Sequence, residues 1–293
     1  MCGFAGFVGE VENREQVLEN MIDTIIHRGP DSSGKFVDED AALGFRRLSI
    51  IDLSESGDQP LYNEDRSKVL VFNGEIYNYQ ELREELIQAG HTFVSNTDSE
   101  TLIHGYEQWG EELVYRLRGM YAFAIWDQKA KRLFSARDIF GIKPLYYAQM
   151  NGTLMFGSEI KSFLEHPKFD KVFNEDALGN YLSFQFVPTN ETFFKGVFCV
   201  QPGHYFVYEN GKMTIKRYFE PNFTGDTTKS FEEVVDDIEK VMKESVEMHK
   251  ISDVEVASYL SSGVDSSYLT YLGQVDRTLS LIHISEPTRL GMI

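Results

Sequence analysis

Apolar residues recur every three or four positions in four stretches of the chain, and each stretch predicts an amphipathic helix. Gly90 is suited to end the second helix, and either Asp98 or Ser99 can cap the third. The expected helices are residues 17–25, residues 78–89, the stretch that follows Asp98 or Ser99, and residues 231–249.

Short apolar runs between these stretches predict β-strands. Many of the runs are apolar along their whole length, which favours sheets that are covered on both faces. We therefore expect roughly the first 210 residues to form an α+β sandwich. The expected strands are residues 69–72, 121–126, 133–136, 154–156, 205–208 and 213–218.

A change in composition marks the end of this sandwich. Residues 221–230 are rich in Pro, Asn, Gly, Asp and Thr, which are typical of a linker between domains. We expect a first domain over residues 1–220 and a second over residues 231–293. In the second domain, a strand at residues 254–260 runs into a tight polar loop and a further helical segment, as at the opening of a βα unit.

The charge and composition argue against several classes of protein. The formal net charge of −18 would repel phosphate backbones, so nucleic-acid binding is not expected. The sequence has no run of about 18 apolar residues and no secretory leader, so neither a membrane span nor export is expected. Its two cysteines, Cys2 and Cys199, do not make a disulfide framework, which predicts a cytoplasmic protein in a reducing compartment.

Cys2 follows the initiator methionine, and its side chain is small enough for that methionine to be removed. Removal would place a thiol and a free α-amine on one residue. An α-amine titrates near ~8 and a cysteine thiol near ~8.5, so the pair can act as nucleophile and base at neutral pH. The alternative interpretation is a small buried apolar residue near the terminus.

Several polar residues could supply what a thiol nucleophile needs to attack an amide. Asn73 and Gly74 offer hydrogen-bond donors for the oxygen that becomes negative. Arg47 could bind the carboxylate of a free amino acid, and Glu75 with Asp98 could bind its ammonium group. Each residue also has an ordinary structural interpretation. Asn73, Gly74 and Glu75 could form a turn after a strand, Arg47 could be an exposed charge, and Asp98 could cap a helix. Together they point to free glutamine or asparagine as substrate.

A series of short segments carries a resemblance to a known family: residues 2–6, 27–31, 47–52, 59–61, 73–78, 97–100, 119–123 and 137–145. In this order, over residues 2–220, they resemble the glutaminase domain of the class II, or N-terminal-nucleophile, amidotransferases. The match is most specific to the glutaminase domain of glutamine-hydrolysing asparagine synthetases.

The resemblance implies a four-layer αββα sandwich and assigns roles in glutamine hydrolysis. Cys2 would be the nucleophile, its α-amine the proton shuttle, and Asn73 with Gly74 the oxyanion hole. Residues 27–31 would form a loop that closes over the pocket, in which His27 is a structural residue and not a base. No metal is required for this chemistry.

The resemblance also implies how glutamine is bound. Arg47 and Asn73 would contact the substrate, Arg47 through the glutamine carboxylate. Glu75 and Asp98 would hold the ammonium group. The backbone around Ile50 and Ile51 would line the pocket.

Residues 261–267 read Ser-Ser-Gly-Val-Asp-Ser-Ser, follow an expected strand and open a helix. Small residues there leave backbone N–H groups free at a helix N-terminus, which favours anion binding, although such a loop is also an ordinary turn. The loop resembles the pyrophosphate loop of ATP pyrophosphatases, of the adenine nucleotide alpha hydrolase-like class. The resemblance implies ATP binding by Ser261, Ser262, Gly263, Asp265, Ser266 and Ser267.

Two residues of this loop bear on how it would bind ATP and its metal ion. Asp265 would be a Mg²⁺ ligand by resemblance. Ser262 stands where the family pattern has glycine, and a side chain at a position of positive φ costs ~1–2 kcal/mol.

The reaction that the resemblance implies is synthesis of asparagine from aspartate, glutamine and ATP, with release of glutamate, AMP and pyrophosphate. The expected partners are these small molecules and a second copy of the chain, with no nucleic acid and no membrane. The alternatives are another class II amidotransferase, against which the loop at residues 261–267 argues, and a non-catalytic regulatory module.

We expect the chain to be an N-terminal fragment of such an enzyme. Residues 281–293 do not resemble the family's continuation and form either a non-native tail or, over residues 278–285, a second strand. One or two parallel strands cannot cover both faces of a sheet, so residues 231–293 should be poorly packed. The fragment should not make asparagine, because the acceptor site is absent.

Overall fold

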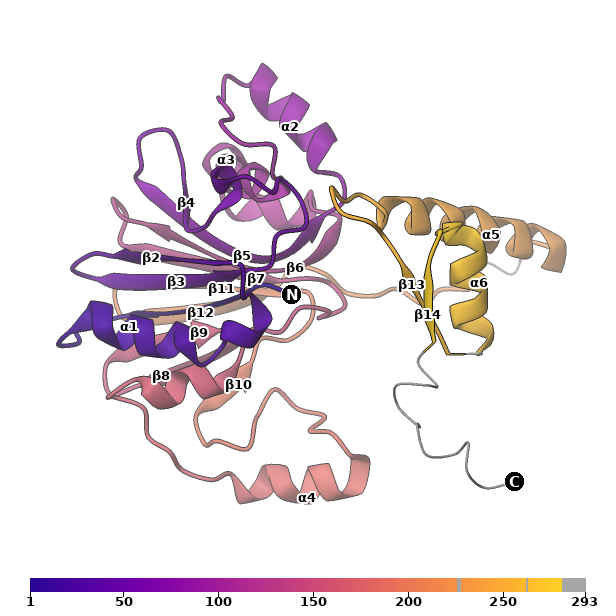
Figure 1. The fold of residues 1–293 in the computed structure, drawn as a ribbon. Helices are drawn as coiled ribbons and strands as arrows, with labels where there is room; N and C mark the ends of the chain where they lie inside the picture. Colours follow the sequence, from indigo (N-terminus) through magenta and orange to yellow (C-terminus); the bar gives the residue numbers. More distant parts are fainter. Residues whose placement is uncertain (226–227, 262, 281–293) are drawn as a thin grey trace. The chain divides into compact units, whose positions relative to one another are not determined.

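The computed structural model describes residues 1–225, 228–261 and 263–280 (Figure 1). The chain divides into two compact units, Met1–Pro221 and Asn222–Ile293. Across the described ranges, none of the helices has both the length and the apolar character needed to span a lipid bilayer.

Two six-stranded antiparallel sheets form the centre of the first unit. The first sheet has the spatial order β10 (Val197–Cys199), β8 (Tyr146–Met150), β9 (Thr153–Gly157), β1 (Gly3–Val8), β3 (Ala41–Arg47) and β2 (Ser32–Val37). The second has the order β12 (Lys212–Arg217), β11 (His204–Glu209), β7 (Arg132–Arg137), β6 (Gly119–Asp127), β5 (Lys68–Ile76) and β4 (Leu61–Tyr62). Strand β1 therefore lies inside its sheet, between β9 and β3.

Helices cover the outer face of each sheet (Figure 1). The first sheet is covered by α1 (Arg14–Asp23) and the 3-10 helix η4 (Ile160–Glu165), and the second by α2 (Tyr79–Gln88), α3 (Asp98–Trp109) and the 3-10 helix η3 (Gly110–Tyr115). The first unit also contains η1 (Ile26–Arg28), η2 (Glu55–Gly57) and α4 (Glu175–Phe184). The four-layer αββα arrangement that the resemblance implied is confirmed.

Apolar side chains fill the spaces between the layers. Phe4 and Trp126 belong to the cluster between the two sheets. Leu102 of α3 packs against the second sheet, while Leu18 and Met21 of α1 pack against the first. Burial of each such side chain contributes roughly 1.5–3 kcal/mol. The prediction of sheets covered on both faces, made from uninterrupted apolar runs, is confirmed.

The described part of the second unit contains α5 (Phe231–Met248), β13 (Ser258–Leu260), α6 (Val264–Gly273) and β14 (Thr278–Ser280). Strands β13 and β14 pair in parallel and α6 lies between them in the chain, so the predicted opening of a βα unit is present. Helix α5 begins with a capping box and has no buried residue; in the described part of this unit, β13 and β14 are the two strands that could cover it.

The structure corrects three details of the sequence analysis. Residues 73–75 lie inside β5, because β6 pairs with them beyond the end of the apolar run. The N-cap position of α3 is Thr97, whose side chain makes no capping hydrogen bond, and the two predicted caps, Asp98 and Ser99, lie in the first turn of the helix. The strand expected over residues 254–260 is limited to β13.

Candidate functional site

A pocket in the first unit lies where the ends of β1, β3 and β5 approach the start of α3. It gathers residues that are far apart in the sequence, and its lining includes every residue predicted for the glutamine site. These are Cys2, Arg47, Ile50, Ile51, Asn73, Gly74, Glu75 and Asp98.

Cys2 is half-buried immediately before β1, and its thiol is held by the backbone of Leu48. The Leu48 amide donates to Sγ at 3.3 Å, and the thiol donates to the Leu48 carbonyl at 3.4 Å. Burial raises the pKa of the Cys2 thiol, against the lowering effect of the Leu48 hydrogen bond and the amino terminus. The thiol is therefore mostly protonated at neutral pH and requires a base to become a nucleophile.

The amino group of the chain belongs to Met1, whose side chain is 59% exposed and lies at the mouth of the same pocket. Burial lowers the pKa of this amino group, which favours the neutral form that can accept a proton. Loss of Met1 would transfer the amino group to Cys2, on the same residue as the thiol.

Asn73 is buried in β5, and its Nδ2 has no hydrogen-bond partner. A buried donor without a partner costs about 1–3 kcal/mol, so such groups are rare unless a ligand completes them. The amide is therefore available to an acceptor that enters the pocket.

Gly74 follows Asn73 at a position where no side chain fits. A Cβ atom there would lie 2.2 Å from the carbonyl oxygen of Met120 and 2.7 Å from the Cα atom of Tyr121, both in the paired strand β6. Close pairing of β5 with β6 thus requires glycine, and it leaves the backbone beside the pocket uncovered.

Asp98 and Glu75 bring two carboxyl groups to the pocket. Asp98 is the first residue of α3, is buried, and accepts a hydrogen bond from the amide of Ile76 at 2.8 Å. Burial raises the pKa of Asp98 to about 7, and the nearby charge of Glu75 adds to this shift. An ammonium group beside Asp98 would favour its charged form.

Arg47 organises the loop that follows β3. Its Nη1 donates to the carbonyl of Ser54 and to Asp58 Oδ1, both at 2.8 Å, and its Nη2 bonds to the carbonyls of Ile51, at 3.4 Å, and Asp52. The side chain thereby fixes the segment that brings Ile50 and Ile51 to the pocket. A substrate carboxylate would meet a guanidinium group that already has an acidic partner.

Sequence reasoning gave no role to Arg28, Gln59 or Lys143, although each lies in a segment that carried the resemblance. Arg28 Nε donates to the Cys2 carbonyl at 2.9 Å, and Gln59 exchanges two hydrogen bonds with the backbone of Phe72, next to Asn73. Lys143 lines the pocket, and burial lowers the pKa of its amine while Glu75 raises it. These three residues place or polarise the groups around Cys2.

His27 does not line the pocket. Its Nε2 lies 2.8 Å from Glu159 Oε1, and the same carboxylate oxygen accepts a hydrogen bond from Arg28 at 3.0 Å. His27 thus supports the position of Arg28, which in turn contacts the Cys2 carbonyl.

The loop before α6 gathers serine hydroxyls. Ser266 Oγ lies 3.2 Å from the amide and 3.0 Å from the hydroxyl of Ser261, and both Ser266 and Ser267 donate to the carbonyl of Gly263. Asp265 is exposed in the first turn of α6. Ser262, which stands where the family pattern has glycine, lies outside the described residues. The loop presents hydroxyls and a helix N-terminus, a chemistry that suits phosphate groups.

Two family comparisons cover most of the chain. Residues 1–219 match the family described as "Glutamine amidotransferase domain", and residues 237–285 match the family described as "Asparagine synthase". Both families agree with the resemblance inferred from the sequence.

Two curated relatives come from Bacillus subtilis. The chain is 44% identical over 275 residues to glutamine-hydrolyzing asparagine synthetase 1, a match that covers 92% of this chain and 43% of the relative. It is 35% identical over 277 residues to glutamine-hydrolyzing asparagine synthetase 3, covering 92% of this chain and 45% of the relative. The chain thus spans less than half the length of either relative.

Among solved structures, the glutamine phosphoribosylpyrophosphate amidotransferase from B. subtilis matches with a TM-score of 0.57 and 17% identity. The match covers 95% of this chain and 65% of the other, and it supports the same fold. Since the first family match extends over residues 1–219, the chain belongs to the family of glutamine amidotransferase domains.

Proposed function

We propose that the pocket hydrolyses glutamine to glutamate and ammonia, with Cys2 as nucleophile. The observation that carries this proposal is the buried Asn73 amide, which lacks a hydrogen-bond partner in the pocket that also holds the Cys2 thiol. A negative oxygen formed by attack of the thiol on an amide would supply that missing partner.

In the proposed reaction, the α-amine of Cys2, freed by removal of Met1, takes the thiol proton. Sulfur then attacks the side-chain carbonyl carbon of glutamine, and Asn73 Nδ2 and the Gly74 amide donate to the oxygen that becomes negative. Transfer of the proton to nitrogen releases ammonia and leaves a γ-glutamyl thioester. Water hydrolyses the thioester, which releases glutamate and restores the thiol.

Substrate binding follows from the charges of the pocket. Asp98 and Glu75 would hold the ammonium group, and Arg47 would hold the carboxylate in competition with Asp58. Ile50 and Ile51 would contact the aliphatic stem. Selectivity for a free amino acid would come from these opposite charges at one end of the pocket.

We propose that the ammonia serves asparagine synthesis in a longer protein, because the two curated relatives are named for that activity. Residues 261, 263, 266 and 267 would contact the phosphates of ATP, and Asp265 would supply one carboxylate ligand to Mg²⁺. Aspartate would be the acceptor of this ammonia. Free thiols at Cys2 and Cys199 agree with a cytoplasmic location.

The test combines intact mass with active-site labelling. The purified chain should lack the mass of Met1 and should be labelled once, at Cys2, by a diazoketone analogue of glutamine. Labelling and ammonia release should be lost in Cys2→Ala and kept in the matched variant Cys199→Ala. Ammonia release by a chain that retains Met1 would contradict the role of the α-amine, and absence of both labelling and ammonia release would favour a non-catalytic module.

A further inference from the structure

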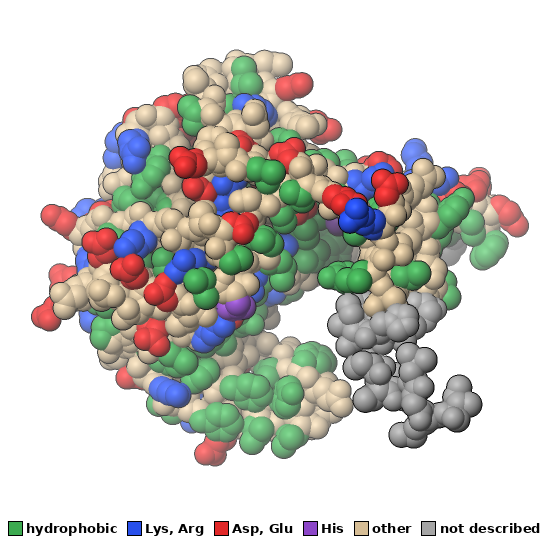
Figure 2. Space-filling model, in the orientation of Figure 1, with side chains coloured by type: hydrophobic (Ala, Val, Ile, Leu, Met, Phe, Trp, Pro, Cys, Tyr) green, Lys and Arg blue, Asp and Glu red, His purple; other side chains and the backbone are tan. Residues whose placement is uncertain are grey.

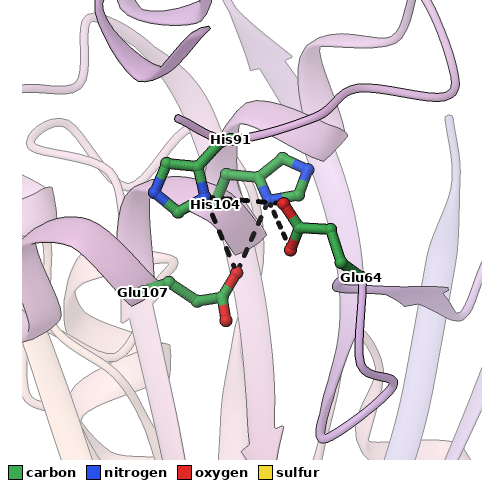
Figure 3. A group of neighbouring side chains, drawn as sticks. All are labelled: Glu64, His91, His104 and Glu107. Carbon is green, nitrogen blue, oxygen red and sulfur yellow. Dashed lines mark ion pairs between the residues drawn. The ribbon is translucent and has the colours of Figure 1, made fainter. Parts of the chain in front are cut away.

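Four side chains converge at a second place in the first unit, outside the glutamine pocket (Figure 3). His104 and Glu107 belong to α3, Glu64 to the connection between β4 and β5, and His91 to the segment after α2. One nitrogen or oxygen atom from each lies within 4.8 Å of the others. These four residues are called the α3 cluster below.

The interior of the α3 cluster contains polar atoms that lack hydrogen bonds. His104 is 1% exposed, and neither its Nδ1 nor Glu107 Oε2 has a hydrogen-bond partner. Both atoms face the centre of the cluster, and the dashed lines of Figure 3 that join the ligand atoms surround this centre. A buried imidazole nitrogen and a buried carboxylate oxygen are costly to leave without a partner.

The atoms lie further apart than hydrogen-bonded atoms, with up to 4.8 Å between one atom of each residue, so the four side chains would draw together around an ion. His104 Nδ1 lies 3.5 Å from Glu64 Oε2 and 3.5 Å from Glu107 Oε2, while His91 Nδ1 lies 3.7 Å from Glu64 Oε1 and 3.9 Å from Glu107 Oε2. Hydrogen bonds between nitrogen and oxygen are usually about 2.7–3.2 Å long. Four ligands at the about 2.0–2.2 Å typical of Zn²⁺ would lie about 3.3–3.6 Å apart around a tetrahedron.

The atoms that point away from the centre are held by other groups. Glu107 Oε1 accepts from Asn63 at 2.7 Å, and His91 Nε2 lies 3.3 Å from Gln108 Oε1. His104 Nε2 faces Glu100 Oε1 at 3.5 Å. Such contacts fix the orientation of a metal-binding imidazole or carboxylate.

Glu100 is itself held firmly. Its two carboxylate oxygens accept hydrogen bonds from the amides of Val94 and Ser95, both at 2.7 Å, and from the Ser95 hydroxyl at 2.6 Å. The contact between Glu100 and His104 therefore joins two buried side chains of α3 in a carboxylate–imidazole pair that leaves Nδ1 directed to the centre.

The charge of the α3 cluster also suits a cation. Burial lowers the pKa of His104, but its contacts with Glu100 and Glu107 outweigh this and raise it to about 9, so a bound ion would have to displace that proton. With both imidazoles neutral, the two carboxylates give the centre a charge of about −2, which a divalent ion would balance. Lys68 lies 3.6 Å from Glu107 Oε1, the oxygen that is directed away from the centre, so it offsets part of this charge without filling the centre. Nitrogen and oxygen donors in a four-coordinate arrangement favour Zn²⁺ over Mg²⁺ or Ca²⁺.

We propose that the α3 cluster binds one Zn²⁺ ion through Glu64, His91, His104 and Glu107. The ion would join α3 to the segment after α2 and to the connection between β4 and β5. Because α3 begins with Asp98 in the glutamine pocket, the ion would also fix the helix that carries that carboxylate. The proposal does not depend on the chemistry proposed for Cys2.

The test measures Zn²⁺ binding to the full chain, without an affinity tag and after treatment with a chelator. The Cys2→Ala background removes the thiol, which could bind Zn²⁺ itself. Isothermal titration with Zn²⁺ should give one site, and Zn²⁺ should raise the midpoint of thermal unfolding. Co²⁺ in place of Zn²⁺ should give the intense visible absorption of a four-coordinate ion.

Two partly exposed ligands allow substitution without loss of the fold. His91→Gln and Glu64→Gln should each weaken Zn²⁺ binding at least tenfold while circular dichroism stays unchanged. The matched control variants His204→Gln, at a partly exposed position of β11, and Glu209→Gln, at an exposed one, should bind as the parent does. The proposal is overturned if the folded parent shows no saturable site, if either cluster variant binds as tightly as the parent, or if Co²⁺ is six-coordinate. If His104 is instead protonated and bound only by carboxylates, the folded parent would show no saturable site.

Discussion

The thiol of Cys2 contacts both backbone groups of Leu48, which lies 46 positions further along the chain. The contact follows from the register of β1 and β3, in which Gly3 pairs with Arg46 and so brings Cys2 opposite Arg47. Arg47 in turn bonds to the loop that carries Ile51 into the pocket. Pairing of two strands thus places the Cys2 thiol, the Arg47 side chain and one wall of the pocket together.

The Asn73 amide gives the most direct test of the site. In Asn73→Ala we expect kcat for glutamine hydrolysis to fall about 100- to 1,000-fold, because loss of one oxyanion donor costs ~2.7–4 kcal/mol of transition-state stabilisation. KM should change little, because the amide has its main acceptor only in the transition state. Ammonia release under steady-state conditions measures both quantities.

Asn20→Ala is a suitable control for this variant, because Asn20 is an exposed residue of α1 that does not line the pocket. Its kinetics should equal those of the parent. A loss in Asn73→Ala that appears only as a higher KM would place Asn73 in substrate binding and not in the oxyanion hole.

The elements that sequence patterns predicted are those with clear periodicity. Apolar spacing indicated α1, α2, α3 and α5, and continuous apolar runs indicated β5, β6 and β7. Strands β1 and β3 were missed, although they carry Cys2 and Arg47. Both contain glycines that make close packing possible: a Cβ at Gly6 would lie 2.6 Å from the Ala42 carbonyl, and one at Gly44 would lie 2.5 Å from Ile22. Glycine lowers the strand propensity that a sequence pattern relies on.

The candidate site residues could be named from the sequence because their chemistry was complementary and their segments resembled a family. The hydrogen bonds of Arg47 to Asp58 and to the loop carbonyls could not be predicted from the sequence, because they depend on the conformation of residues 48–58. The α3 cluster could not be predicted either. Its ligands come from three separate segments, and the spacing of His104 and Glu107 is common on helices.

Asp98 predicts how glutamine binding depends on pH. With its pKa at about 7 in the free site, Asp98 must lose a proton to pair with the ammonium group of glutamine. Affinity should therefore rise about tenfold between pH 6 and pH 8, the increase in the charged fraction of a group with that pKa. Calorimetry with the Cys2→Ala chain measures binding without turnover.

Asp98→Asn is the matched control for this pH dependence, since it keeps the shape of the side chain and removes its titration. Its affinity should be lower and nearly constant over the same range. Equal slopes in the two proteins would assign the pH dependence to another group, of which Glu75 and Lys143 are the charged neighbours in the pocket.

Gly74 predicts a cost in stability. In Gly74→Ala the new methyl group would meet the Met120 carbonyl at 2.2 Å, so β5 and β6 must move apart. We expect a loss of about 1–3 kcal/mol in the free energy of unfolding, as for other overpacked sites, together with loss of glutamine hydrolysis. Chemical denaturation followed by circular dichroism measures the first effect.

Gly179→Ala provides the comparison for Gly74→Ala. Gly179 lies within α4, and a Cβ atom there would meet nothing within 4 Å. Alanine should therefore stabilise the chain by up to about 1 kcal/mol and leave hydrolysis unchanged. Equal stability of Gly74→Ala and the parent would mean that the strand pair adapts to the methyl group without strain.

The division of the chain predicts that the first unit is sufficient for glutamine hydrolysis. Every residue that lines the pocket precedes Gln149, and the three apolar clusters of the sandwich end at Phe219. A chain that ends at Pro221 should therefore fold and should hydrolyse glutamine with the kcat/KM of the longer chain. A chain that ends at Gly203 should fail to fold, because it lacks β11, which pairs with β7, and the buried side chains of Tyr205 and Tyr218. Folding of the chain to Pro221 with loss of hydrolysis would instead mean that the second unit is needed to hold the glutamine pocket in its active form.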